Sequence, residues 1–463
     1  MVALIGAVAF QAIGCGRDDA GADAPADWTK LPAVLSPDPE LAFIGTRQER
    51  YDQICARKRG DAFARVLCGP GGRPAIRDLA ALLKLVGLDE NRAFALTGNS
   101  TSLVAMSVNP LNPRLIVFPR VGADLKQPAE MTAVGFVRGE PFVEIVSRDP
   151  GTDDLNFYLV SFERRCDYEG SGCDLASVLT EEIEHDWTAY SVYDHDDLEA
   201  TSFDCMSCHR PAGQGTKRIL RMQELSSPWL HWFPQRFAQR TDSDRILLAK
   251  FTDMHAVDKQ YGGVPISTIA GAIDEGSGAQ LEALVRAEGF GQQPNPFDAQ
   301  IVTEMKATGS SPTWQARFDV HLAGQAIAVP YPAVDVTDEA KSAAAARSYQ
   351  DVVHGATARA NLLDVRQVFS ADATQKLGFV PVAGADGKTV LLEICARCHD
   401  GRGNPDIAKN HFDVLKLDQL SRAEKDLAIT RLTAPTVGMR MPPWRVGALA
   451  PEAIAAATSE LQK

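Results

Sequence analysis

Eight of the nine cysteines in this 463-residue chain fall into four closely spaced pairs, and this spacing constrains the fold more than any other feature. In two of the pairs, Cys55 with Cys68 and Cys166 with Cys173, only a short stretch of chain separates the two residues. Local pairs of this kind are typical of disulfides that form in an oxidising compartment. We therefore predict two disulfides and an exported protein.

The other two pairs belong to a five-residue motif, CxxCH, that occurs twice. The six residues that define the two copies are Cys205, Cys208, His209, Cys395, Cys398 and His399. CxxCH is the attachment signature of c-type haem: two thiols on one helical turn bond both vinyl groups, and the adjacent imidazole becomes the proximal iron ligand. A zinc site would need the two CxxC pairs close together in the sequence, and a thioredoxin-like motif rarely carries His directly afterwards. The motifs predict two covalently attached haems c.

The second motif lies in a C-terminal region, 388–463, with a helical pattern. Ser421 is followed three residues later by Glu424, which predicts a capping box at a helix start, and Pro451 predicts the start of a terminal helix. A Met-Arg-Met-Pro-Pro-Trp loop at 439–444 lies between these two helices. With a CxxCH helix, a second helix, a Met-Pro loop and a terminal helix, the region resembles a class I cytochrome c domain.

The resemblance implies that His399 and Met441 are the two axial ligands of the second haem. Met441 is preferred to Met439 because the ligand in this family is followed by proline, as Pro442 follows here. His411 is a rival sixth ligand, although it follows His399 too closely for the family pattern. The alternative is that both methionines only pack the loop.

The distal ligand of the first haem is less clearly specified, because no Met-Pro follows His209. Four side chains are candidates: Met222, His231, Met254 and His255. We favour Met222, on a short amphipathic stretch, and then His255 as its rival. A coordination position left open is the third option.

The N-terminal residues are a second feature that predicts export. Residues 1–14 carry no charge and are almost wholly apolar, as in an export signal, and a polar stretch at 15–30 follows. The small residues before Cys15 resemble the lipobox of bacterial lipoproteins, which implies a lipid on the Cys15 thiol. Ala12 departs from that pattern, where Leu is usual, and no basic residue precedes the apolar run. An ordinary secretory signal and a buried N-terminal helix are the alternatives.

The regions between these features predict an α+β protein of several domains. After a helical stretch at 77–85, short β-rich runs suggest a mostly antiparallel sheet, with a tight hairpin at 137–142. Residues 314–322 alternate as in a strand, and 337–355 contain strong helix formers after a capping Thr or Asp. The expected layout is a mixed, mostly antiparallel β domain at 31–200, a helical first-haem region at 201–310, a strand and helix connector at 311–387 and the C-terminal cytochrome c domain at 388–463.

Charge excludes some partners and favours others. A net charge of −13 and a pI near 5.2 argue against nucleic-acid binding, which needs clustered Lys and Arg, and they leave room for a basic protein partner. Acidic runs at 180–186 and 194–199 could bind a hard cation, but an exposed, solvated face is the plainer interpretation. After the leader, no run of 18 apolar residues predicts a membrane span, so contact with a membrane is expected only through a lipid on Cys15.

Together these features predict an exported dihaem cytochrome c that transfers electrons between redox partner proteins outside the cytoplasm. It is expected on the periplasmic side of a bacterial membrane or at the cell surface, as an outer-membrane lipoprotein or else as a soluble periplasmic protein. The alternative is a dihaem peroxidase that uses the first haem as an open peroxide-binding site. A third possibility is a sensing protein whose β-rich part docks a partner. No Ser nucleophile elbow, phosphate loop or HExxH pattern occurs.

Overall fold

The computed structural model describes part of the chain, namely residues 41, 47–90, 92–97, 108–119, 131–167, 173–199, 201, 203–209, 218, 250–272, 312, 338–370, 380–396, 399, 411–434, 440–442 and 449–463. The predictions made for the leader with Cys15, for the strand at 314–322 and for Met222 lie outside these residues. None of the described helices is long and apolar enough to cross a membrane.

The central element is a six-stranded antiparallel sheet in which every strand pairs with its neighbours along the chain. Its strands are β1 (Arg92–Thr97), β2 (Arg114–Pro119), β3 (Thr132–Phe136), β4 (Phe142–Arg148), β5 (Leu155–Arg164) and β6 (Trp187–Asp194). The turn between β3 and β4 contains Gly139 at a positive φ of 102°, where glycine is favoured. The predicted antiparallel sheet, the predicted hairpin and the α+β class are confirmed.

Both faces of this sheet are buried. Successive side chains of a strand point to opposite faces, so Val143 and Tyr158 lie on one face, within the largest core cluster. Val146 and Phe157 lie on the other face, in a smaller apolar cluster. We call the first the helix face, because short helices cover it, and the second the loop face, because the segment with Cys205 and Met206 packs on it.

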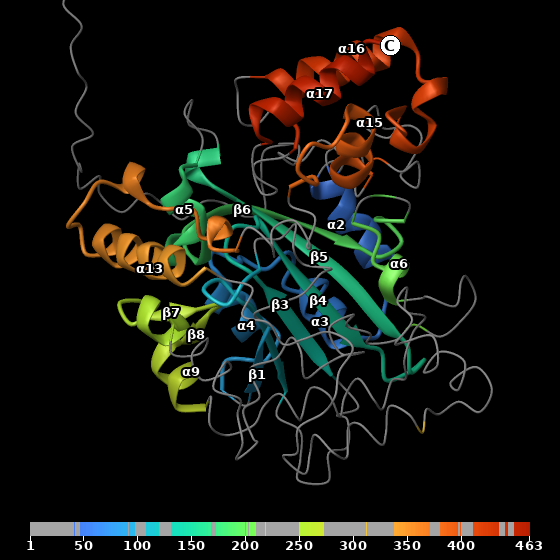
Figure 1. Cartoon of the computed structure of the whole chain (residues 1–463). Coiled ribbons are helices and arrows are strands. Elements are labelled where there is room, and N and C mark those ends of the chain that lie inside the picture. The colour runs from blue at the N-terminus through green and yellow to red at the C-terminus, as the bar shows by residue number, and fades with distance from the viewer. Residues whose placement is uncertain are drawn as a thin grey trace, which may run out of the picture.

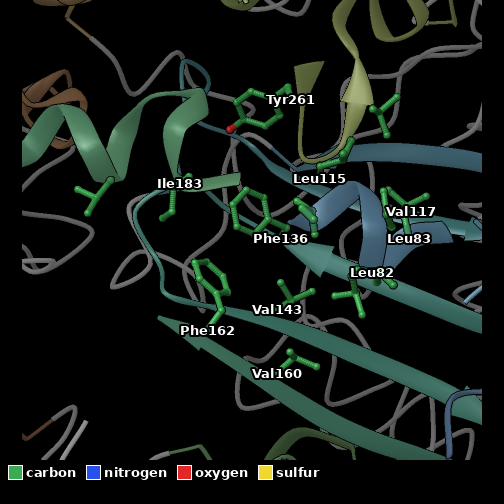
Figure 2. Close-up of a cluster of buried hydrophobic side chains, with 14 of the residues drawn as sticks. Leu82, Leu83, Leu115, Val117, Phe136, Val143, Val160, Phe162, Ile183 and Tyr261 are labelled. Atoms are coloured by element: carbon green, nitrogen blue, oxygen red, sulfur yellow. The ribbon is translucent and has the colours of Figure 1, made fainter. Parts of the chain in front are cut away.

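Short helices cover the helix face (Figure 1). They are α2 (Arg47–Ala56), α3 (Ala62–Leu67), α4 (Leu79–Leu85) and α5 (Leu175–Leu179), with the 3-10 turns η2 (Arg165–Asp167) and η3 (Glu181–Glu184). The side chains of Asp61, Asp78 and Asp174 accept the backbone N–H three residues on, and each therefore caps a helix start. Figure 2 shows Leu82 and Leu83 of α4 among the strand side chains of this core.

The same core continues into parts of the chain that follow the first CxxCH motif. A tight hairpin of β7 (Gln260–Tyr261) and β8 (Val264–Pro265) leads into α9 (Ile266–Ala272). Further on lie α13 (Glu339–Val353), η5 (Arg359–Asn361) and η6 (Val365–Gln367). Tyr261 and Tyr349 are fully buried in the core of the sheet. The predicted helix at 337–355 is thus confirmed, with Asp338 as its cap.

This core extends across the boundary predicted at residue 200. Residues 250–272, predicted to belong to a separate helical region, contain the β7–β8 hairpin, and they pack on the sheet together with α13. The hairpin turn needs glycine, because Gly262 and Gly263 have φ of 60° and 74°, and a Cβ on Gly262 would lie 2.4 Å from Leu115. An amphipathic pattern shows that a segment is half-buried, but it does not identify the partner on which the segment packs.

The C-terminal elements form a core of their own. They are α15 (Gly387–Val390), which continues as the π-helical turn η7 (Leu391–Cys395), then η9 (Val414–Gln419), α16 (Arg422–Thr433) and α17 (Pro451–Leu461). The capping box of Ser421 and Glu424 and the helix start at Pro451 are confirmed. A Cβ on Gly387 would lie 2.1 Å from the Ala456 carbonyl oxygen, so this close approach of α15 and α17 requires glycine.

Both predicted disulfides are present. Cys55 bonds Cys68, with Cα atoms 5.3 Å apart, and Cys166 bonds Cys173, with Cα atoms 4.7 Å apart. The first bridge joins the end of α2 to the end of α3, and the second joins η2 to the residue that precedes the cap of α5.

Candidate haem-attachment sites

The first CxxCH motif forms a single helical turn, α6 (Met206–His209). The carboxylate of Asp204 accepts the N–H of Met206 at 2.8 Å, and the N–H of His209 donates to the Cys205 carbonyl oxygen at 2.9 Å. This second bond places the first thiol and the imidazole on the same turn, as the motif requires for attachment to one ligand.

The loop face of the sheet supports this turn. Half-buried Cys205 and Met206 pack against the apolar cluster of that face, and Phe203 packs edge-on against Phe142 of β4. The imidazole of His209 stacks on the ring of Phe157 of β5, with centroids 4.1 Å apart and 27° between the ring planes. The sheet therefore fixes the orientation of the candidate iron ligand.

A second histidine, His195, also packs against Phe157. His195 is buried, its ring packs edge-on against Phe157 at 6.4 Å, and its Nδ1 accepts the Phe157 N–H at 3.3 Å. The guanidinium of Arg218, also buried, contacts Nε2 of His195. Burial, with the positive charges of Arg59 and Arg218, lowers the pKa of His195 to about 4. The ring is therefore neutral at pH 7.

The second motif repeats the local geometry of the first. The N–H of His399 donates to the Cys395 carbonyl oxygen at 2.9 Å, and the His399 carbonyl accepts the N–H of Val414 at 2.9 Å. An aromatic ring again flanks the imidazole, because Phe412 lies edge-on to His399 with centroids 5.4 Å apart. Cys395, the last residue of η7, packs against the C-terminal core.

The Met-Pro loop is anchored to the end of α16. The N–H of Met441 donates to the carbonyl oxygen of Arg431 at 2.9 Å, and the Met441 side chain is half-buried. Met439 lies outside the described residues. His411, the rival sixth ligand, is exposed. The implied pairing of His399 with Met441 stays a prediction.

Two candidates for the distal position of the first haem lie on the other side of the sheet. Met254 and His255 are buried in the core of the helix face, whereas His209 stacks on the loop face. The imidazole of His255 is also occupied: Nδ1 lies 2.7 Å from an Asp258 carboxylate oxygen, and Nε2 lies 2.7 Å from the Leu111 carbonyl oxygen. This placement disfavours His255 as an axial ligand. Met222 and His231 lie outside the described residues.

The described residues fit a covalently held haem. Each motif offers a half-buried cysteine and an imidazole on one turn, beside an aromatic ring and an apolar cluster. A thioether-bound macrocycle needs such thiols and an apolar surface against its ring. The Cys208 and Cys398 side chains lie outside the described part of the chain.

The acidic runs are only in part the solvated face that the sequence favours: Glu182, Asp186, Asp196 and Glu199 are exposed, but two other carboxylates are not. Glu184 and Asp194 are fully buried, and each is paired with arginine from another part of the chain. Among the described residues, the one group with metal-ligand geometry is Cys166, Asp167 and Cys173, and its cysteines form a disulfide. The carboxylates in these runs balance internal arginines, a role that local sequence cannot reveal.

The sequence also gave no sign of a buried charge cluster around Arg138. Its side chain is completely buried and donates to Glu184 at 2.8 Å, to Asp258 at 2.7 Å and to the Tyr349 hydroxyl at 2.8 Å. Burial alone would raise the pKa of Asp258, but the Arg138 charge and the hydrogen bond from His255 lower it overall. The His255 ring lies in the same cluster, with Nδ1 2.7 Å from an Asp258 carboxylate oxygen and 3.4 Å from Nη1 of Arg138. The cluster thus places one buried guanidinium between two buried carboxylates.

No protein-family profile matches the chain, and neither a curated protein nor a solved structure is similar to it at a significant level. The functional argument therefore depends on the residues of the two motifs and on their surroundings.

Proposed function

We propose that the protein is an exported dihaem c-type cytochrome that carries out outer-sphere electron transfer between partners outside the cytoplasm. The observation that carries this proposal is the repetition of one local geometry at two distant CxxCH motifs. In each motif the histidine N–H bonds the first cysteine carbonyl at 2.9 Å, and an aromatic ring flanks the imidazole. Two disulfides outside the motifs support a location in an oxidising compartment.

In this proposal each residue of a motif has a separate task. The thiols of Cys205 and Cys208, and those of Cys395 and Cys398, hold one haem each, and His209 and His399 are the proximal ligands. A bound haem supplies one-electron chemistry at iron. Phe157 and Phe412 restrict rotation of the imidazoles, and the apolar clusters keep water away from the attachment turns.

A second candidate function is a dihaem peroxidase with an open first haem. The observation that favours it is the position of Met254 and His255, which lie on the opposite face of the sheet from His209. This leaves Met222, His231 or no protein ligand for the sixth position. A peroxidase also needs an acid–base side chain near an open iron.

The haem content of purified protein tests the main proposal. An alkaline pyridine spectrum is expected to show two c-type haems per chain. Cys205→Ala with Cys208→Ala should remove one haem, and Cys395→Ala with Cys398→Ala should remove the other. The matched control is Cys55→Ala with Cys68→Ala, which removes two cysteines but no motif and should keep both haems. Two haems retained in either motif variant would refute the attachment argument.

A titration of the reduced protein with carbon monoxide, and of the oxidised protein with peroxide, separates the two candidate functions. An electron carrier with both haems fully ligated should bind neither reagent. Binding at one haem per chain, lost in the Cys205→Ala, Cys208→Ala variant, would favour the peroxidase.

We further propose that a lipid on Cys15 holds the protein at a membrane surface and that its redox partner is basic. The net charge of −13 supports steering of a positively charged protein toward this chain. Cys15→Ser should move haem protein from the membrane fraction to the soluble fraction. If mass spectrometry finds an unmodified Cys15, the lipid anchor is refuted and only the proposal of export remains.

A further inference from the structure

A buried group of hydrogen-bond donors lies next to the first attachment turn. Phe157 joins the two sites, because its ring stacks on His209 at 4.1 Å and packs edge-on against His195 at 6.4 Å. The sum of these centroid distances sets an upper limit of 10.5 Å between the two imidazoles. Arg218, nine residues after His209 in the chain, lies against His195.

The donors in this group outnumber the acceptors. Nδ1 of His195 faces the Phe157 N–H, which can only donate, and a neutral imidazole has only one nitrogen that can accept. Nε2 in turn faces Nη1 of Arg218, which also can only donate. The nearest carboxylate oxygen to Nε2 is that of Asp196 at 3.5 Å, which is too long for a good hydrogen bond.

Burial makes this surplus of donors costly. His195 is 2% exposed and Arg218 is 9% exposed, so water cannot satisfy their N–H groups freely. Among the residues that the structure describes, Arg218 has one anionic partner, Asp154 at 3.1 Å, whose side chain is itself 43% exposed. An acceptor with a negative charge placed between His195 and Arg218 would satisfy both donors.

We propose that His195 and Arg218 bind a propionate carboxylate of the first haem, and that they act as positioning residues for it. This inference rests on the proposed function, because it takes a haem held by Cys205 and His209 as given. A haem brings its own carboxylates, and the link through Phe157 places the donors close to the proximal imidazole. Guanidinium and carboxylate form strong charge-assisted hydrogen bonds.

The charge of Arg218 should then affect the first haem and not the second. A positive charge close to the macrocycle disfavours the oxidised, more positive iron, so it raises the midpoint potential. Arg218→Gln should therefore lower the potential of the first haem and leave that of the second unchanged. Arg218→Lys, which keeps the charge, should retain most of the wild-type potential.

The test is a spectroelectrochemical titration of the full-length holoprotein. Repeating the titration in the Cys395→Ala, Cys398→Ala variant assigns the step of the first haem. The control is Arg359→Gln, which removes the same charge from an exposed ion pair with Asp174 and Glu182 and should shift neither haem.

The inference is overturned if Arg218→Gln leaves the first potential unchanged or shifts both haems equally. If Arg218→Gln loses the first haem, Arg218→Lys must restore both haem content and potential, and failure to do so also overturns it. Fewer than two haems in the wild-type protein would instead refute the proposed function, so the two failures are distinguishable.

Discussion

Replacement of Arg138 by methionine should be the most destabilising single change among the charged residues of the sheet domain. The substitution keeps an apolar chain of similar length and removes the only guanidinium between Glu184 and Asp258. Asp258 would keep His255 and Tyr349 as partners, whereas Glu184 would keep the N–H of Gly263, at 3.0 Å. The variant therefore leaves a buried carboxylate without a counter-charge.

The size of the effect follows from burial. Removing one partner of a buried ion pair costs about 3–5 kcal/mol, and Arg138 is 0% exposed and serves two carboxylates, so we expect about 5 kcal/mol for Arg138→Met. Adding Glu184→Gln removes the carboxylate that has lost its counter-charge, and the neutral amide can still accept the N–H of Gly263. The double variant should therefore be more stable than Arg138→Met alone.

Urea unfolding of the holoprotein, followed by circular dichroism at pH 7, measures these differences. Arg359→Met is the matched control, because its side chain is 42% exposed and its ion pairs should contribute less than about 1 kcal/mol. A double variant that is less stable than Arg138→Met would refute the reasoning, because removal of the unpaired carboxylate could not then be the dominant effect.

Three further predictions concern ligation, pH and the first disulfide. Met441→Ala should abolish a sulfur-to-iron absorption band, allow carbon monoxide to bind the second haem and lower its midpoint potential. Met439→Ala is the control and should change little. The reverse pattern would place the ligand at Met439. In the Cys205→Ala, Cys208→Ala variant, which would have no haem carboxylate beside His195, the pKa of His195 falls from 6.5 to about 4 on folding. Protons therefore bind the unfolded state first, and the free energy of unfolding should decrease as the pH falls from about 6.5 to 4, by up to about 3 kcal/mol. His195→Gln should flatten this part of a pH series of urea titrations, and an unchanged slope would contradict the assignment. Cys55→Ala with Cys68→Ala opens a loop of sequence separation 13 and should cost about 3 kcal/mol in the same assay, whereas no loss would show that the closed loop adds no stability.

Features that depend on residues close in sequence were predicted correctly. The Cys55–Cys68 disulfide, the capping box at Ser421 and the turn at Gly139 each involve contacts within a short stretch of chain. Residue type and spacing are enough to specify such contacts, because few other arrangements are available to them.

Features that depend on distant contacts were not predicted. Arg138 pairs with Glu184 and Asp258, which lie 46 and 120 residues away, and nothing in their local sequence distinguishes them from solvated charges. The surroundings of the first candidate haem-attachment site could not be predicted either, because His209 contacts Phe157 through tertiary packing. A strand pattern shows which residues are apolar, but only the fold shows what covers each face.

The two faces of the sheet explain why one sheet serves both the stability of the domain and the candidate site. A strand that is half-exposed alternates apolar and polar residues, yet β5 is buried along its whole length, from Leu155 to Arg164. Its helix face is covered by helices, so its loop face needs a cover as well, and the segment with Phe203, Cys205 and Met206 packs there. A haem held at this turn would extend that apolar cover. Loss of the first haem should therefore destabilise the sheet domain as well as remove a redox centre, a coupling that follows from the position of Phe157 between the attachment turn and the sheet.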